Sequence, residues 1–177
     1  MRKVRYAVAM SLDGYIAGPN GEYDWIVMPS DAAAYFKEFY AQFDIAIMGR
    51  RTFEVFGGAV EGMRTYVFSR TLAPGSHQDV TILGEDGVAR LREIRLEDGK
   101  DIWLFGGGDL FASLASASLV DTVEVGVMPV ILGAGIPLLA GTGGQVKLRL
   151  IKSDADAQGV LSLEYAVEQS NGPKLDS

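Results

Sequence analysis

The sequence contains no cysteine, and its 177 residues include a single histidine, His77. Without cysteine the chain forms no disulfide bond and offers no thiolate metal ligand or thiol nucleophile. One histidine in the polar stretch APGSHQD makes neither a zinc site nor the base of a catalytic triad, so we assign His77 no role and expect no metal site. A chain without cysteine suits the reducing cytoplasm, where we expect this protein to act.

Basic clusters and membrane-spanning runs are missing as well. Lys and Arg total 16 against 23 Asp and Glu, for a net charge of −7, whereas nucleic-acid binding requires clustered basic residues. The uncharged run 125–146 contains Pro129, Pro137 and six glycines, so we expect a buried strand and a glycine-rich loop there, not a membrane helix. The residues after the basic start include Arg5 and Asp13 and lack the long apolar core of a signal peptide. We expect neither a nucleic-acid partner nor a membrane partner.

Hydrophobic residues make up 48% of the chain and charged residues 22%, as in a folded domain. We expect one domain over residues 1–168 and a polar tail over 169–177. Strand patterns alternate with helix patterns, which predicts an α/β fold whose mixed, mostly parallel sheet is covered on both faces. The expected strands are 3–11, 44–48, 65–69, 80–84, 101–105 and 120–131, with a hairpin over 146–168. The expected helices are 31–42, 49–57, 87–99 and 108–119.

Two strand ends carry residues that could bind anions. In IMGRRTFE a strand ends before Gly49 and a helix begins near Thr52, so backbone N–H groups and two arginines could hold a phosphate. In VFSRTL, Ser69 and Arg70 end a strand and could hold a phosphate monoester. Taken alone, each stretch is better explained as a polar turn, with solvated arginines in the first.

The stretch DIWLFGGGDLFASLA places three glycines between an apolar strand and a helix. It is not the G-x-G-x-x-G fingerprint, because Phe111 stands where the third glycine would be. No Gly-Lys-Ser/Thr follows, so it is not a nucleotide-hydrolase loop either. Three glycines cost roughly 1 kcal/mol each relative to alanine, more than a flexible joint requires. Together the three junctions predict a ligand with several phosphates.

The motifs AVAMSLDGYIAG, IMGRRTFEVFG, VFSR, FGGGDL and VMPVILGAGIPLL occur in this order. The ordered set resembles the dihydrofolate reductase-like superfamily, over residues 3 to about 168. More narrowly, it resembles the C-terminal reductase domain of bifunctional riboflavin-biosynthesis deaminase–reductases and its free-standing bacterial relatives. The resemblance implies a three-layer fold with an eight-stranded sheet and about four helices, NADPH as cofactor, and a homodimer. The zinc deaminase signature is absent, so only the reductase half is expected.

The resemblance assigns four groups of cofactor-binding residues. Those at the phosphates and the adenosine side are Gly49, Arg50, Arg51 and Thr52. Those at the ribose 2′-phosphate, which distinguishes NADPH from NADH, are Ser69 and Arg70. Those that cradle the pyrophosphate are Gly106, Gly107, Gly108, Asp109 and Leu110. Those that line the nicotinamide pocket are Ala9, Ile16 and Ala17.

Reduction also needs a proton donor, for which Asp31 is the candidate catalytic and substrate-binding residue. WIVMPSDAAAYFK resembles the helix start that carries the acidic residue of folate reductases, although the spacing from Asp31 to Phe36 is one residue longer. A helix N-cap explains Asp31 equally well. Asp13 and Asp24 are alternative donors, or solvated turn residues. Trp25 could form a wall of the substrate pocket, or be a core aromatic.

The substrate follows from the resemblance only in part. Folate reductases bind the glutamate tail of folate with an arginine just before their third strand, where this chain has Met63, with Arg64 one place later. A shift of one residue reverses the side-chain direction on a strand, which counts against dihydrofolate. We expect an NADPH-dependent reductase of the 5-amino-6-(5-phosphoribosylamino)uracil reductase type, acting on a heterocyclic or sugar-imine substrate. The alternatives are dihydrofolate reduction, or NADPH binding without turnover. The apolar run 125–146 is the expected dimer face.

Overall fold

The computed structural model describes residues 1–77, 79–139, 141 and 145–168, and the expected polar tail 169–177 lies outside the described residues. The helices are α1 (Ala32–Tyr40), α2 (Arg50–Phe56), α3 (Gly87–Ile94) and α4 (Gly108–Ser116). The first strands are β1 (Val4–Ser11), β2 (Tyr15–Ala17), β3 (Phe43–Gly49), β4 (Arg64–Phe68), β5 (Gly75–His77) and β6 (Val80–Leu83). The remaining strands are β7 (Asp101–Gly106), β8 (Thr122–Met128), β9 (Ile136–Pro137), β10 (Leu148–Ala155) and β11 (Leu161–Val167).

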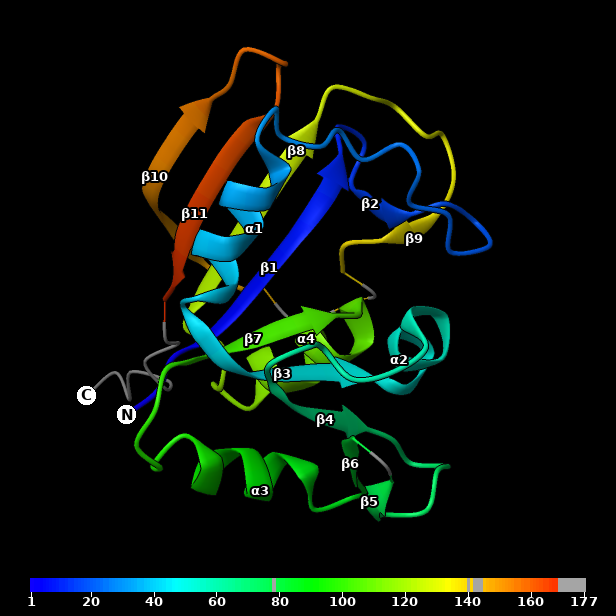
Figure 1. The fold of residues 1–177 in the computed structure, drawn as a ribbon, viewed down its shortest axis with the longest axis vertical. Helices are drawn as coiled ribbons and strands as arrows, with labels where there is room; N and C mark the ends of the chain where they lie inside the picture. The colour runs from blue at the N-terminus through cyan, green and yellow to red at the C-terminus, as the bar shows by residue number, and fades with distance from the viewer. Residues whose placement is uncertain (78, 140, 142–144, 169–177) are drawn as a thin grey trace, which may run out of the picture.

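A sheet of nine strands in the order β10-β11-β8-β1-β7-β3-β4-β6-β5 forms the centre of the molecule (Figure 1). The strands from β8 to β6 pair in parallel, while β11, β10 and β5 add antiparallel edges. The expected mixed, mostly parallel sheet is confirmed, with one strand more than expected. The added strand is β5, only three exposed residues long, which carries no hydrophobic alternation that a sequence pattern could reveal.

A second, two-stranded sheet pairs β2 with β9, in segments that we expected to be loops. These strands have three and two residues, too short for a periodic pattern. The two strands, β2 and β9, are paired with each other and with no other strand of the described residues. The backbones approach so closely that a side chain on Gly135 would overlap the carbonyl oxygen of Ala17. The pairing therefore depends on glycine at this position.

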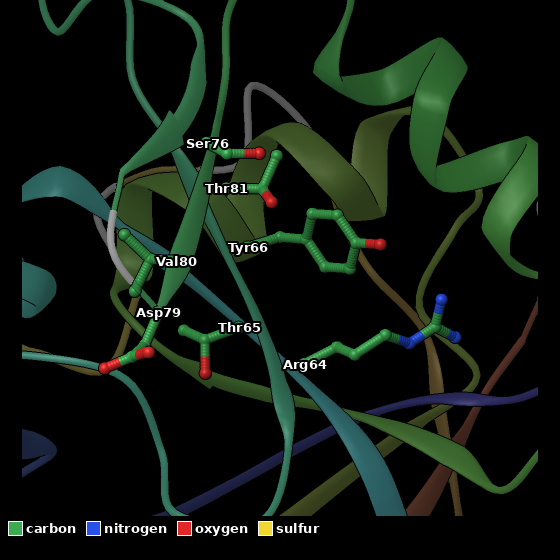
Figure 2. A pocket seen from close by; sticks show the side chains of 7 residues that line it. All are labelled: Arg64, Thr65, Tyr66, Ser76, Asp79, Val80 and Thr81. Atoms are coloured by element: carbon green, nitrogen blue, oxygen red, sulfur yellow. The ribbon is translucent and has the colours of Figure 1, made fainter.

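Figure 2 shows a cavity of about 160 Å³ beside β4 and β6. Its lining residues are Arg64, Thr65, Tyr66, Ser76, Asp79, Val80 and Thr81. Thr65 and Val80 are register partners near the amino-terminal ends of the two parallel strands. The cavity therefore lies at the edge of the sheet opposite to the one where ligands of open α/β sheets bind.

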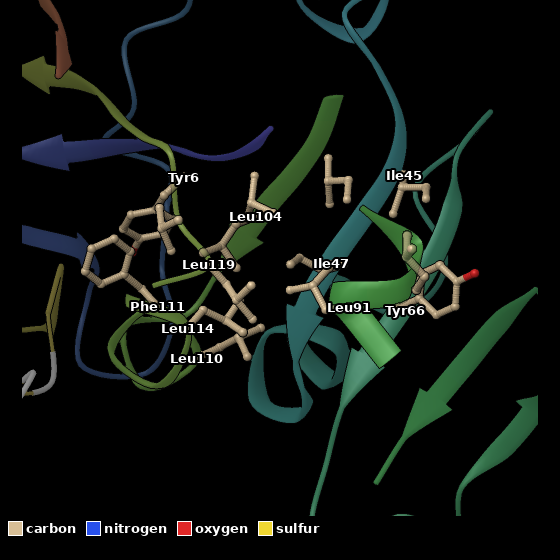
Figure 3. Packing of buried hydrophobic residues seen from close by; sticks show 14 of the residues in the cluster. Tyr6, Ile45, Ile47, Tyr66, Leu91, Leu104, Leu110, Phe111, Leu114 and Leu119 are labelled. Atoms are coloured by element: carbon tan, nitrogen blue, oxygen red, sulfur yellow. The ribbon is translucent and has the colours of Figure 1, made fainter. Parts of the chain in front are cut away.

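Helices cover both faces of the sheet, and residue alternation along β7 separates the two cores. Ile102 and Leu104 face α3 and α4 in one cluster, whose packing Figure 3 shows. Trp103 and Phe105 face α1 and α2 in the other. In the first core the ring of Tyr6 lies 4.7 Å from that of Phe111 of α4. The expected three layers and four helices are thus confirmed.

The hairpin at the end of the chain is far less covered than the centre of the sheet. Every residue of β10 is exposed, including Leu148, Leu150 and Ile151, which are 41%, 50% and 49% exposed. β10 is also one of the two edge strands of the sheet, the other being the short β5. Among the helices of the described residues, none is long and apolar enough to cross a membrane.

Candidate active site at the carboxyl edge of the sheet

Four of the predicted binding segments follow neighbouring strands of the sheet. In the order β1-β7-β3-β4, the strand ends carry Ala9, the glycines after Phe105, Gly49 and Ser69. These strands are parallel, so their carboxyl ends lie at one edge, where ligands of α/β sheets bind. With about 4.8 Å between neighbouring strands, the row extends over roughly 14 Å. Segments up to about 100 residues apart in sequence thereby form one continuous edge.

The glycines at 106–108 lie against the start of α2. Gly106 has φ +156°, and a Cβ on Gly106 or Gly107 would lie 3.4 Å from Oγ1 of Thr52. A Cβ on Gly49 would lie 4.0 Å from the backbone nitrogen of Gly107. Gly49 and Gly107 are also the N-caps of α2 and α4, and neither helix has a side-chain cap. The positive φ of Gly106 favours glycine, and the lack of capping side chains leaves helix N–H groups open to an anion.

The two arginines of α2 have different partners. Arg50 donates to both carboxylate oxygens of Glu54, at 2.7 and 2.8 Å, one helical turn away. The guanidinium of Arg51 is exposed and lies 3.9 Å from Asp109 in the first turn of α4. Arg51 is the more available cation, because its partner is at the limit of an ion pair.

Ser69 and Arg70 differ in their surroundings. Ser69 is buried, and its Oγ accepts hydrogen bonds from the backbone nitrogens of Thr71 and Leu72, at 3.1 and 2.9 Å. The hydroxyl of Ser69 thus shapes the turn after β4, and it also lies 3.5 Å from the hydroxyl of Thr71, with which it can share a proton. Arg70 is exposed at this turn, and no carboxylate of the described residues lies within 4.0 Å of it.

The predicted nicotinamide end combines β1 with the small sheet. Ala9 is paired with Gly126 of β8, and Ile16 and Ala17 belong to β2. Asp13 connects these loops: its carboxylate accepts from Ser11 Oγ at 2.7 Å, from the Leu132 nitrogen at 3.1 Å and from the Gly133 nitrogen at 2.8 Å.

These hydrogen bonds, above all that from Ser11, lower the pKa of Asp13. Asp13 is therefore suited to hold the loops together as a carboxylate, not to donate a proton. The pKa of Glu22, in the same loop, is lowered by its hydrogen bond from Asn20.

Asp31 caps helix α1. Its Oδ1 accepts a hydrogen bond of 3.0 Å from the backbone nitrogen of Ala34, and its carboxylate is exposed. This is the structural explanation that the sequence left open beside the catalytic one, and the two are compatible. Trp25 is half-buried, and its indole N–H donates to the Glu22 carbonyl at 3.0 Å. Asp24 is exposed.

A model of the RibD C-terminal domain matches residues 2–162. This chain belongs to the RibD C-terminal domain family. Two relatives come from Bacillus subtilis (strain 168). The uncharacterized protein YyaP is 30% identical over 93% of this chain and 94% of its own length. The uncharacterized protein YwjB is 35% identical over 84% of this chain and 89% of its own length.

Solved structures share the fold of this RibD C-terminal domain. A protein of Shewanella sp. PV-4 named for riboflavin biosynthesis has a TM-score of 0.77 at 24% identity, covering 96% of this chain and all of its own. A pyrimidine reductase-like protein of Corynebacterium diphtheriae has a TM-score of 0.70 at 14% identity, covering 95% of this chain and 92% of its own.

A deaminase/reductase of Thermotoga maritima, named for diaminohydroxyphosphoribosylaminopyrimidine deaminase and 5-amino-6-(5-phosphoribosylamino)uracil reductase, has a TM-score of 0.69 at 18% identity. The match covers 94% of this chain and 56% of that one. The expected fold and the resemblance to riboflavin-biosynthesis reductases are confirmed.

The structure of this RibD C-terminal domain also reveals aromatic residues that sequence reasoning missed. Phe105, directly before the glycines, contacts Trp103 at 4.6 Å and Phe56 of α2 at 4.9 Å between ring centroids. Ala7 packs in the same cluster, so Ala9, two residues further along β1, has its side chain on the same face of the sheet. The alternation of side chains in the strand DIWLF, which puts Trp103 and Phe105 on one face and Ile102 and Leu104 on the other, could have predicted this contact.

Arg64 and Met63 diverge as the spacing predicted. Met63 is buried in the core on the α1–α2 face. Arg64 is exposed at the start of β4 and lines the cavity of Figure 2. It donates a hydrogen bond of 3.0 Å to Glu97, which follows α3 in the chain. The guanidinium is therefore directed away from the carboxyl edge of the sheet.

Proposed function

We propose that this protein is an NADPH-dependent reductase. One observation carries the proposal: four predicted binding segments follow the adjacent strands β1, β7, β3 and β4 at a single edge of the sheet. An extended dinucleotide needs such a row, with an apolar end for nicotinamide and donors for its phosphates. The family supports a reductase, and the following roles extend that assignment to this chain's residues.

The glycine segment 106–108 and Thr52 would hold the pyrophosphate. The fit is supported by the positive φ of Gly106 and by the hydroxyl of Thr52, which lies 3.4 Å from where a Cβ on Gly106 or Gly107 would stand. Arg51 would add a positive charge at the same place. Arg70, with the hydroxyl of Ser69, would bind the ribose 2′-phosphate and so favour NADPH over NADH.

When bound, the nicotinamide supplies a hydride to an electrophilic carbon of the substrate and is itself oxidised, leaving NADP⁺. The adjacent nitrogen or oxygen of the substrate then takes a proton, so that a C=N or C=O bond becomes CH–NH or CH–OH. Asp31, exposed at the start of α1, is the proposed donor. Ala9, Ile16 and Ala17 would orient the ring, and Trp25 would border the substrate.

The substrate that we propose is a heterocycle or sugar imine of the 5-amino-6-(5-phosphoribosylamino)uracil type, in preference to dihydrofolate. Folate reduction needs a cation for the glutamate tail near the substrate. The side chain at the corresponding position, Met63, is buried, and Arg64 pairs with Glu97. Among the described residues, neither of these positions offers the required cation at the carboxyl edge.

Absorbance at 340 nm tests the proposal. The purified protein is mixed with NADPH and either dihydrofolate or the pyrimidine intermediate, and NADPH binding is measured separately by calorimetry. Binding followed by loss of absorbance with the pyrimidine supports the proposed function, and loss with dihydrofolate alone favours folate reduction. Binding with no loss in either mixture favours a protein that binds NADPH without turnover. No heat with NADPH at millimolar concentrations would overturn the proposal itself.

We also propose that the protein is a cytoplasmic homodimer. The exposed leucines and isoleucine of β10 lie on the free edge of the sheet, where a second copy would cover them. The run 125–146 shares only residues 125–128 with β8, which is already paired on both sides, and its exposed Ile131 and Ile136 keep it as the second candidate for the dimer face. Sedimentation of the protein and of a Leu150→Glu variant tests the interface.

A further inference from the structure

Three hydroxyl-bearing side chains form a row across the cavity of Figure 2. Tyr66 of β4 is the register partner of Thr81 of β6, which is also the partner of Ser76 of β5. Register partners on neighbouring strands have their side chains on the same face of a sheet, and Figure 2 shows these three extending to the same side. With about 4.8 Å between strands, the Cα atoms of this hydroxyl row span roughly 10 Å. The hydroxyl row therefore offers several hydrogen-bonding groups to one ligand.

The hydroxyls of this row have no partners within the protein. Tyr66 is only 8% exposed, yet in the described part of the chain its hydroxyl has no hydrogen-bond partner. The hydroxyls of Ser76 and Thr81 have none there either. The ring of Tyr66 packs in the core beside Leu91, which fixes the position of its hydroxyl (Figure 3). A fixed polar group in a nearly buried residue is stabilised when a ligand or water bonds with it.

Arg64 adds donors on the same face. It lies two residues before Tyr66 on β4, so both side chains have the same direction. Its Nη2 donates to Glu97 at 3.0 Å, while Nε and Nη1 have no hydrogen-bond partner among the described residues. The neighbouring Arg2 is buried and paired with Asp44, so it is not available to a ligand. Arg64 is thus the guanidinium that a ligand in the cavity would meet.

The charges around the cavity are balanced. Glu97, the partner of Arg64, also lies 3.9 Å from Arg90, which donates to Glu93 at 2.6 Å. Two guanidinium groups therefore face two carboxylates, and Asp79 in the cavity lining adds a further negative charge. A phosphate or carboxylate would find no unbalanced cation here. The lining favours an uncharged ligand with hydrogen-bonding groups.

We infer that this cavity is a binding site for a small uncharged polyol, a molecule of about five carbons that carries several hydroxyl groups. Such hydroxyls both donate and accept, as the hydroxyl row does, and they can accept from Arg64. The volume of about 160 Å³ is roughly five times the share of one water molecule in the liquid, which leaves room for a molecule of this size. The cavity is at the amino-terminal edge of β4 and β6, so this site is separate from the proposed reductase site.

Titration of the isotope-labelled full chain, followed by the NMR shifts of its amides, tests the inference. The probe is ribitol, a five-carbon polyol. We expect saturable shifts of the amides of residues 64–66, 75–77 and 80–82, with a Kd in the millimolar range and no shifts at residues 106–108. Two further probes serve as comparisons. The first, 1,5-pentanediol, has the same length but lacks the inner hydroxyls, and it should bind at least about tenfold more weakly. The second, inorganic phosphate, should not bind.

A conservative variant locates the ligand at the hydroxyl row. Tyr66→Phe keeps the ring in the core and removes only the hydroxyl, so it should weaken ribitol about tenfold. Its NADPH affinity should be unchanged. Tyr165→Phe, on β11 outside the cavity lining, is the matched control and should leave ribitol binding unchanged. Thr81→Val removes the next hydroxyl of the row and should also weaken ribitol.

Three results would overturn the inference. One is the lack of saturable shifts at tens of millimolar ribitol, and another is binding of phosphate more tightly than ribitol, which would indicate an anion site. The third is equal binding of ribitol and 1,5-pentanediol, or of ribitol by the wild type and Tyr66→Phe, because the hydroxyls would then not hold the ligand. None of these readouts involves NADPH, so a failure of the proposed reductase function would leave them unchanged.

Discussion

The two halves of the proposed site have opposite chemistry. At the ends of β7, β3 and β4, glycines, uncapped helix starts and the exposed Arg51 and Arg70 form an edge suited to a polyanion. Beside β1, the small side chains of Ala9 and Ala17 and the contacting rings of Phe56 and Phe105 form an apolar region suited to a ring. The comparison shows how a single edge of the sheet can bind the phosphates of a dinucleotide at one end and the reacting rings at the other.

The halves also differ in how they are held. The glycine segment lies between elements of the main sheet and is fixed by their packing. The β1 side depends on the two-stranded β2–β9 sheet and on the hydrogen bonds of Asp13. Substitutions in the glycine segment should therefore change cofactor affinity. Substitutions on the β1 side should instead make its loops more or less mobile.

The largest expected effect belongs to Gly106→Ala. At φ +156° a side chain is strained by roughly 1–3 kcal/mol, and the new methyl group would lie in contact with Oγ1 of Thr52, in the space proposed for the pyrophosphate. We expect NADPH affinity to fall of the order of a hundredfold in calorimetry. Gly58→Ala is the control, because a Cβ there meets open space. A folded Gly106→Ala variant with unchanged affinity would show that the glycines do not hold the pyrophosphate.

Arg70→Ala should distinguish the two dinucleotides. A hydrogen bond to a charged group contributes about 1.5–3 kcal/mol, so losing Arg70 should weaken NADPH roughly tenfold or more. NADH, which lacks the 2′-phosphate, should bind as before. Titration of both nucleotides into Arg70→Ala and into Arg92→Ala, a control on α3, measures the contrast. Equal weakening of NADPH and NADH binding would show that Arg70 does not bind the 2′-phosphate.

These two predictions concern the half that the sequence revealed best. Long apolar strands such as 44–48 and 101–105 have a periodic signal, and the motifs at their ends could be placed once the strand order was known. The β1 side was less predictable. Two of the donors to the Asp13 carboxylate are backbone nitrogens 119 and 120 positions away, and β2 and β9 are too short to show a period. The contact between Phe56 and Phe105 likewise arises only when α2 packs on the sheet.

Asp13→Asn should loosen the β1 side and leave the other half unchanged. An amide has one acceptor oxygen and cannot accept all three hydrogen bonds that Asp13 receives. We expect the amides of residues 15–17 to exchange about tenfold faster in hydrogen-exchange measurements, while the Kd of 2′-phosphoadenosine fragments stays constant. Asp24→Asn, in the same loop, is the control. Unchanged exchange would contradict the role of Asp13.

The pH dependence of this loop has a definite sign. The folded pKa of Asp13 is lowered, so its contribution is fully present above the ordinary aspartate pKa and is lost as pH falls through the lowered value. Protection of residues 15–17 should therefore be constant at neutral pH and decline only in acid, below about pH 4. In Asp13→Asn this loss of protection in acid should be absent. A loss of equal size in the variant would mean that another titrating group causes it.

The smallest effect is expected for Arg64→Ala, which tests the exclusion of folate. The pair with Glu97 is at the surface, with side chains 51% and 35% exposed, and such pairs contribute at most about 1 kcal/mol. For a chain of this size Tm should fall by no more than about 4 °C. Because Arg64 lies at the amino-terminal edge of β4 and faces away from the carboxyl edge, the affinity for dihydrofolate should change less than about twofold. A large loss of dihydrofolate affinity, with pterin affinity unchanged, would mean that Arg64 reaches the glutamate tail after all, and dihydrofolate would then be favoured over the pyrimidine as the substrate.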